Sequence, residues 1–118
     1  MIDHVLLSVS DLERSAAFYD AVFFALGARR MPAAQGDLGW GVDGPVLEIA
    51  AGEARPAGAG HVALRAAGKA AVDAAHAAGL EAGGGEGAPP GGRPQYGPRG
   101  YGATLRDPDG QHVELIGR

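Results

Sequence analysis

The sequence contains no cysteine among its 118 residues. This absence excludes disulfide bonds, thiolate metal ligands and cysteine nucleophiles together, and it fits an intracellular protein. No apolar run approaches the length of a membrane span, and no basic leader precedes an apolar stretch at the N-terminus. We therefore expect a cytoplasmic protein without a membrane segment.

Positive charge is also scarce. The chain has 10 Lys and Arg residues against 14 Asp and Glu residues, a formal net charge of -4, and no basic block. Binding to nucleic acid or to an anionic membrane surface through charge is therefore not expected. The length suffices for one domain with a hydrophobic core, but not for two large domains.

The elements that the sequence predicts occur in the same order twice. Residues 2–9 are rich in Val, Leu and Ile and predict a strand. The capping pattern Ser10-Asp11-Leu12-Glu13 predicts the start of a helix that runs to about Leu26, with Gly27 as its C-terminal cap. Three short strands follow, over residues 29–33, 38–42 and 46–50.

The second half repeats this order after a linker without periodicity. Residues 61–66 repeat the opening strand, and a shorter, alanine-rich helix over residues 69–78 ends at Gly79. The glycine-rich stretch 83–100 hides one expected strand, and residues 101–106 and 111–116 form the last two. The prediction is one α+β domain built from two βαβββ modules: module one is residues 1–51, the linker is residues 52–60 and module two is residues 61–118.

Matched positions of the two modules carry histidine and glutamate. His4 and His61 lie in the opening strands, and Glu48 and Glu114 lie within apolar stretches of the closing strands. A glutamate in such a stretch needs a partner, a metal or a raised pKa. Simpler alternatives exist for each residue: Glu114 could face water and Glu48 could pack at a strand edge. His4 could be solvated, and His61 could be bonded to backbone. Together, two imidazoles and two carboxylates suit a divalent transition metal such as Zn, Ni, Co, Mn or Fe better than calcium.

The motifs of the chain resemble those of the vicinal oxygen chelate superfamily, which includes glyoxalase I, extradiol dioxygenases and bleomycin-binding proteins. The resemblance rests on these stretches: Asp3-His4-Val5, Asp11-Leu12-Glu13-Arg14-Ser15 with Phe18-Tyr19, Gly60-His61-Val62-Ala63, and Asp107-Pro108-Asp109-Gly110 leading to Val113-Glu114-Leu115. It implies a glyoxalase-like fold, in which paired βαβββ modules form a cupped mixed sheet around a metal. It also implies a homodimer, because two chains of this family often share the sites.

The residue at position 48 separates activities within this family. Bacterial-type glyoxalase I enzymes have Glu there, so the resemblance implies a glyoxalase-type metal site made of His4, Glu48, His61 and Glu114, with Zn or Ni preferred and Fe, Co or Mn as alternatives. Two other functions stay open: an extradiol-type dioxygenase that uses His4, His61 and Glu114, and a metal-free protein that binds a small molecule, like the bleomycin-resistance proteins. Ser8 stands where glutathione-using relatives have a basic residue.

The chemistry that this resemblance implies is proton transfer on a small substrate with two vicinal oxygens, such as a 2-oxoaldehyde thiol adduct. A divalent metal acidifies the neighbouring C–H, and Glu114 or Glu48 acts as the base. The glycine-rich stretch could close over the pocket and bring Arg93, Tyr96 or Tyr101 to the substrate, or could be a plain surface loop. His76 and His112 are expected to be surface residues.

Overall fold

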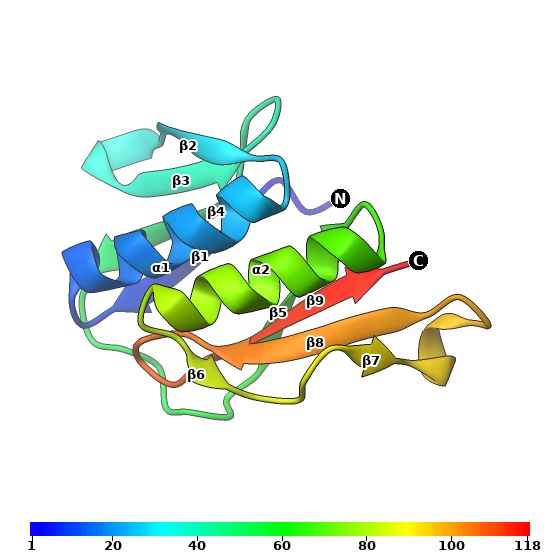
Figure 1. Cartoon of the computed structure of the whole chain (residues 1–118). Coiled ribbons are helices and arrows are strands. Elements are labelled where there is room, and N and C mark those ends of the chain that lie inside the picture. The colour runs from blue at the N-terminus through cyan, green and yellow to red at the C-terminus, as the bar shows by residue number, and fades with distance from the viewer.

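The computed structural model describes all of residues 1–118 and contains two β-sheets and two long helices (Figure 1). The first sheet has the strand order β1-β4-β3-β2, in which β1 pairs in parallel with β4 and the other neighbours are antiparallel. Its elements are β1 (Val5–Val9), α1 (Leu12–Ala25), β2 (Arg29–Pro32), a 3₁₀ turn η1 (Ala34–Gly36), β3 (Leu38–Gly41) and β4 (Pro45–Ala51).

The second sheet repeats this topology, with the strand order β5-β9-β8-β6 and a parallel pair β5–β9. The strand expected in the glycine-rich stretch is two short pieces, β6 and β7, which both pair with β8. The elements are β5 (His61–Ala66), α2 (Lys69–Glu81), β6 (Gly85–Glu86), β7 (Gly91–Gly92), a 3₁₀ turn η2 (Pro94–Tyr96), β8 (Tyr101–Arg106) and β9 (His112–Gly117). The predicted α+β fold of two βαβββ modules is confirmed.

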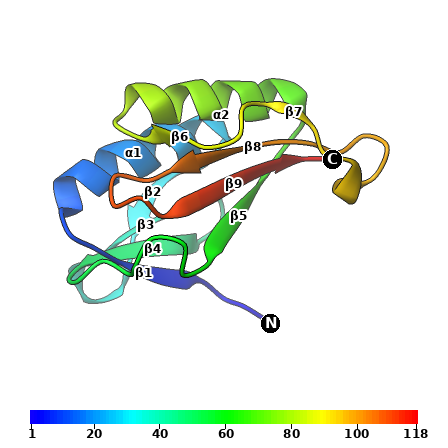
Figure 2. The same ribbon diagram turned by 90° about the horizontal axis from the view of Figure 1, so that it is seen from below.

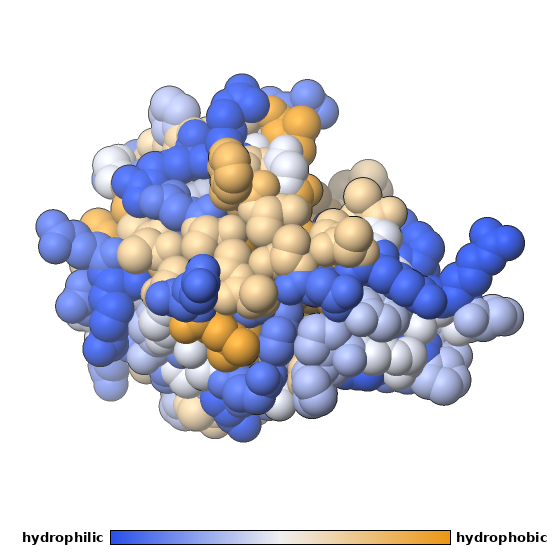
Figure 3. Space-filling view, in the orientation of Figure 1, coloured by the Kyte–Doolittle hydropathy of each residue, from blue (hydrophilic) through white to orange (hydrophobic).

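One hydrophobic core joins the two modules. The helices lie on the same side of the molecule and pack against each other, each over the sheet of its own module (Figures 1 and 2). Alternate strand residues point under the helices, for example Leu47 and Ile49 in β4 and Val113 and Leu115 in β9, and all four are buried. Figure 3 shows the helical side, where a pale orange, mildly apolar surface is bordered by blue hydrophilic residues.

The other face of each sheet carries no helix, and we call it the outer face. In module one it includes Leu6 and Val46, which keep 53% and 51% of their surface exposed. No helix of the structure has both the length and the apolar character that crossing a membrane requires.

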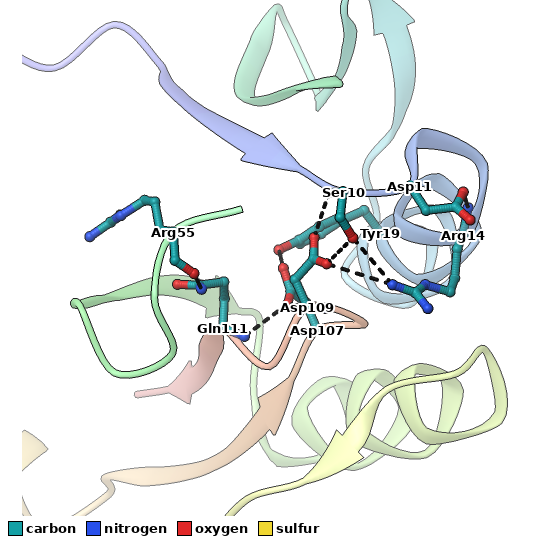
Figure 4. Close-up of polar contacts among 8 residues, drawn as sticks. All are labelled: Ser10, Asp11, Arg14, Tyr19, Arg55, Asp107, Asp109 and Gln111. Carbon is teal, nitrogen blue, oxygen red and sulfur yellow. Dashed lines mark hydrogen bonds and ion pairs between the residues drawn. The ribbon is translucent and has the colours of Figure 1, made fainter. Parts of the chain in front are cut away.

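A polar cluster fixes the start of β9 to the start of α1 (Figure 4). Asp107 is 3% exposed, accepts the backbone N–H groups of Asp109 and Gln111 at 2.9 Å, and accepts the hydroxyl of Tyr19 at 2.8 Å. The backbone N–H of Ser10 donates to Asp109 at 3.0 Å, and its hydroxyl donates to the same carboxylate. The turn that begins the last strand is therefore held by residues of module one.

This cluster corrects the predicted start of the first helix. Asp11, rather than Ser10, is the N-cap, and its side chain accepts the backbone N–H of Arg14 at 3.0 Å. Ser10 does not cap the helix because its hydroxyl donates to Asp109.

Two predictions for the second helix were also wrong. The helix continues through Gly79 to Glu81, and the glycine with a positive φ after it is Gly83. Gly79 serves packing instead: a Cβ there would sit 2.6 Å from Leu105 Cδ1 and 3.0 Å from Val22 Cγ2. His76 is 7% exposed rather than a surface residue, because the helix turns it toward Glu86, with Nε2 and Oε1 2.6 Å apart.

Candidate metal centre

The first candidate pair, His4 and Glu48, lies on the outer face of module one. Leu6 of β1 is paired with Glu48 of β4, so His4, two residues before Leu6, projects from the same face. His4 Nε2 and Glu48 Oε2 are 3.6 Å apart. This separation is too long for a hydrogen bond, but two ligand atoms about 2.1 Å from one tetrahedral metal lie about 3.4 Å apart. The donors therefore fit a shared transition metal.

Asp3 orients this imidazole. Its Oδ1 lies 2.7 Å from His4 Nδ1, which leaves Nε2 facing Glu48. A carboxylate behind a ligating histidine is a common second partner in metal sites because it fixes the tautomer and the ring orientation. The hydrogen bond to Asp3 raises the pKa of His4, and the charge of Glu48 adds to the effect.

Glu48 is a buried carboxylate in an otherwise apolar setting. Its side chain is 7% exposed, and half-exposed His4 is its ion-pair partner. Gly39 of β3 lies opposite, and a Cβ there would come within 3.4 Å of Glu48 Cγ. A side chain at Gly39 would meet Pro45 first, at 2.8 Å, so packing between the strands keeps this position small. A buried negative charge beside one partly exposed imidazole is a setting that a bound cation would stabilise.

The second candidate pair, His61 and Glu114, lies on the outer face of module two. His61 begins β5 opposite His112, and Ala63 is paired with Glu114 of β9, so all four project from one face. His61 is exposed and Glu114 is half-buried. The hydroxyl of Tyr96, in the turn η2, donates to Glu114 Oε1. This hydrogen bond raises the pKa of Tyr96.

The four predicted ligands lie on two faces rather than in one cluster within a single chain, and only His4 and Glu48 approach within 4 Å. The structure contains no group of three or more His, Asp or Glu side chains that could hold a metal ion. Each pair is on the outer face of a different sheet. Each chain therefore presents two half-sites, each of one imidazole and one carboxylate.

The predicted substrate residues are separated by the fold. Tyr96 reaches Glu114, whereas Tyr101 lies on the helix side of β8 and its hydroxyl donates to Asp73 of α2 at 2.6 Å. Arg93 donates to the carbonyl of Pro89 at 2.9 Å and so holds its own loop. Arg30 of β2 is likewise held in place, by an ion pair with Asp20 at 2.7 Å.

Sequence reasoning missed two residues close to the half-sites. Asp3 precedes His4 directly, so its position behind the imidazole could have been suspected. His112, which was expected to be a surface residue, is half-buried and shares the outer face with Glu114. The sequence could have shown this, because alternate residues of a strand project from the same face and residues 112 and 114 are two apart.

Two hollows lie near the outer faces. One, of about 350 Å³, is mostly apolar and lies between α1, the β3–β4 turn and β5, and none of the predicted ligands lines it. The other is smaller, about 160 Å³, and lies beyond Glu114 on the outer face of module two. It is lined by Ala63, Leu64, Arg65, Ile116 and Arg118.

Comparison with known proteins agrees with the fold. The sequence matches the family model described as "Glyoxalase/Bleomycin resistance protein/Dioxygenase superfamily" over residues 1–115. A glyoxalase/bleomycin resistance protein from Albidiferax ferrireducens T118 is 31% identical, with a TM-score of 0.80 over 98% of this chain and 96% of that chain.

More distant structures share the fold. The fosfomycin resistance protein FosX from Mesorhizobium loti is 23% identical, with a TM-score of 0.75 over 100% of this chain and 92% of that chain. The hypothetical protein SA1046 from S. aureus is 24% identical, with a TM-score of 0.74 over 100% of this chain and 95% of that chain. No curated protein matches the sequence.

Proposed function

Because the chain belongs to the glyoxalase/bleomycin resistance protein/dioxygenase superfamily, we propose that it is a metal-dependent lyase or isomerase of glyoxalase type. Its substrate is a small molecule with two vicinal oxygens, and the reaction is a proton transfer. The observation that carries this proposal is the pair of His4 Nε2 and Glu48 Oε2, 3.6 Å apart, with the imidazole oriented by Asp3. A second carboxylate at the metal distinguishes this set from a His, His, Glu triad.

The complete site forms between two copies of the chain. The outer face of module one from one protomer covers the outer face of module two from its partner, so that His4 and Glu48 meet the partner's His61 and Glu114. The exposed side chains of Leu6 and Val46 support this arrangement, because apolar groups on an uncovered sheet gain stability when a partner covers them. A twofold axis gives each dimer two such sites.

The residues of the chain have distinct roles in the proposed reaction. When bound, a divalent metal such as Zn or Ni acidifies the C–H next to a coordinated carbonyl. Glu48 or Glu114 accepts that proton and returns it to the adjacent carbon. Tyr96 positions Glu114 through its hydroxyl and brings the η2 turn over this half-site. The apolar surroundings of Glu48 reduce competition from water.

A complementation experiment tests the shared site. His4→Ala and His61→Ala each damage every site of their own homodimer, so both variants lose most of their metal and activity. In a mixed dimer of one His4→Ala chain and one His61→Ala chain, one site contains both substitutions and the other site contains neither. Random pairing makes half of the dimers mixed, so co-refolded variants regain about a quarter of the wild-type metal content and activity.

The activity is assayed on a panel of hemithioacetals and compared with oxygen uptake on catechols. Wild-type protein that takes up neither Zn nor Ni would contradict the metal site. Oxygen consumption with a catechol would replace the proposal with the extradiol-type dioxygenase. A mixture of the two variants that regains nothing would contradict the sharing between chains.

A further inference from the structure

Two arginines on the outer face of module two have no polar partner. Arg65 and Arg118 form neither an ion pair nor a side-chain hydrogen bond, although the chain has more acidic than basic residues. Five other arginines are held by a carboxylate or by a backbone carbonyl, namely Arg14, Arg30, Arg55, Arg93 and Arg106, whereas exposed Arg29 and Arg99 also lack a partner. The two guanidinium groups are therefore free to bind a ligand.

Both arginines line the hollow of about 160 Å³ that lies beyond Glu114, and no acidic residue lines it. Arg65 is paired with Ile116, one same-face step along the strands from the pair of Ala63 and Glu114. Ala63 also lines the hollow, so the hollow begins at the level of Glu114, and Arg65 lies about 7 Å further along because alternate residues of a strand are about 7 Å apart. A short substrate can span this distance.

Tyr96 links Arg118 to Glu114. The guanidinium carbon of Arg118 lies 5.3 Å from the centre of the Tyr96 ring, and the hydroxyl of the same ring donates to Glu114. This stacking limits the freedom of the arginine without neutralising its charge. Tyr96 thus fixes the position of the Arg118 guanidinium relative to Glu114, the proposed metal ligand.

More positive charge gathers behind Arg118. A second hollow, of about 370 Å³, is bounded by Arg118 together with Lys69 and Arg99, and again no acidic residue lines it. The end of β9 is thus surrounded by cations in a protein of net charge -4. Such a concentration of one sign creates a local positive potential that attracts an anion.

We propose that Arg65 and Arg118 form a subsite for a small oxyanion group, a carboxylate, phosphate or phosphonate, carried by the substrate. A guanidinium presents two parallel N–H donors that match the oxygens of such a group. This inference rests on the proposed function in one respect only: the part of the substrate outside the oxyanion group is the vicinal-oxygen compound proposed above. The substrate class is then a short vicinal-oxygen compound with one anionic end.

Direct binding tests the subsite without any turnover. Inorganic phosphate, methylphosphonate and acetate are titrated separately into ¹⁵N-labelled protein, and amide shifts are followed by NMR. We expect saturable shifts concentrated at residues 63–66 and 116–118, and binding at least about tenfold weaker in both Arg65→Gln and Arg118→Gln. The strongest of the three ligands identifies the preferred oxyanion.

Arg29→Gln is the matched control. Arg29 is exposed on β2, in the other module, and its substitution removes the same charge. Unchanged binding in this variant supports the subsite, whereas equal weakening in all three variants would show a general charge effect and overturn it. Shifts scattered over the surface, or loss in only one of the two subsite variants, would also overturn the pair.

The same titration in His61→Ala protein separates this inference from the proposed function. Oxyanion binding that persists there, in protein that takes up no metal, supports the subsite whether or not the metal chemistry is correct. Loss of oxyanion binding together with the metal would overturn a subsite built by the two arginines.

Discussion

At the scale of single residues, the buried carboxylates have separate tasks. Asp107 is satisfied by two backbone N–H groups and the hydroxyl of Tyr19, so it is structural. Glu48 has one half-exposed imidazole as its ion-pair partner and is therefore available to a ligand. Asp107 and Glu48 are similarly buried, but their hydrogen-bond and ion-pair partners distinguish a structural role from a ligand-binding role.

Substitution of Glu48 tests its role in the proposed reaction. We expect Glu48→Gln to keep the metal, because the amide oxygen can still coordinate, but to lower isomerase activity at least tenfold. That loss equals about 1.4 kcal/mol of transition-state stabilisation. Steady-state kinetics with metal analysis measure both effects, and Glu53→Gln, in the exposed linker, is the matched control. Full activity of Glu48→Gln would rule out the glyoxalase-type assignment.

Substitution of Tyr19 tests the polar cluster. Tyr19→Phe removes the donor to Asp107 and leaves a buried carboxylate oxygen without a partner, at a cost of about 1–3 kcal/mol in the free energy of unfolding. Urea denaturation at neutral pH measures the difference. A change below about 0.5 kcal/mol would mean that the hydroxyl contributes little.

The same tyrosine predicts a dependence on alkaline pH. Burial, followed by the charge of Asp107, raises the pKa of Tyr19 far above its ordinary value of about 10. Above pH 10 the unfolded chain releases this proton and the folded chain keeps it, so stability falls by up to about 1.4 kcal/mol per pH unit for this group. Tyr19→Phe should reduce the slope of unfolding free energy against pH between about pH 10 and 11.5.

At the scale of elements, the two helices approach each other at a glycine. Gly79 lies in the last turn of α2, where helix propensity alone favours alanine by up to about 1 kcal/mol. There is no space for an alanine side chain at position 79, because Leu105 and Val22 would lie 2.6 and 3.0 Å from its Cβ. Packing between modules therefore outweighs local preference at this position.

Gly79→Ala measures that balance. Overpacking costs about 1–3 kcal/mol, so we expect a net destabilisation of about 1 kcal/mol despite the gain in propensity. Ala77→Gly, at an exposed position of the same helix, calibrates the propensity term. Thermal denaturation compares the two variants, and a stabilised Gly79→Ala would show that the helices separate without cost.

At the scale of the whole molecule, the uncovered sheet faces are the surfaces through which we propose that two chains assemble. Leu6 lies on the outer face of module one beside Glu48, so we expect Leu6→Asp to convert a homodimer into a monomer of 11.9 kDa and to reduce metal uptake. Light scattering at micromolar concentration measures the mass. Phe24→Ser, at an 82% exposed position of α1, is the control that should stay dimeric. A monomeric wild type would contradict the shared site.

Most of the element order could be predicted because each module has a clear apolar periodicity and has glycines between its helices and strands. The errors came from contacts between residues distant in sequence: Ser10 bonds to Asp109, and Gly79 packs against the other helix. For the site, the matched positions of the two modules pointed to His4 and Glu48, and the strand register places both on one face. Parity could also have shown that Tyr101 faces the helix with Ala103 and Leu105, away from Glu114. The division into half-sites depends on how the modules pack, which periodicity does not encode.

The polar cluster of Figure 4 also has a mechanical consequence for β9. Its first residues follow a turn bonded to α1, whereas its last residues lead to Arg118, which only stacks on Tyr96. The strand is paired on both sides up to Gly117, and only Arg118 beyond it depends on a single stacking contact. Ligand-dependent motion should concentrate at Arg118 and in the η2 turn. Hydrogen exchange should therefore be slow along the strand, near Val113, and change most on oxyanion binding at Arg118 and in η2.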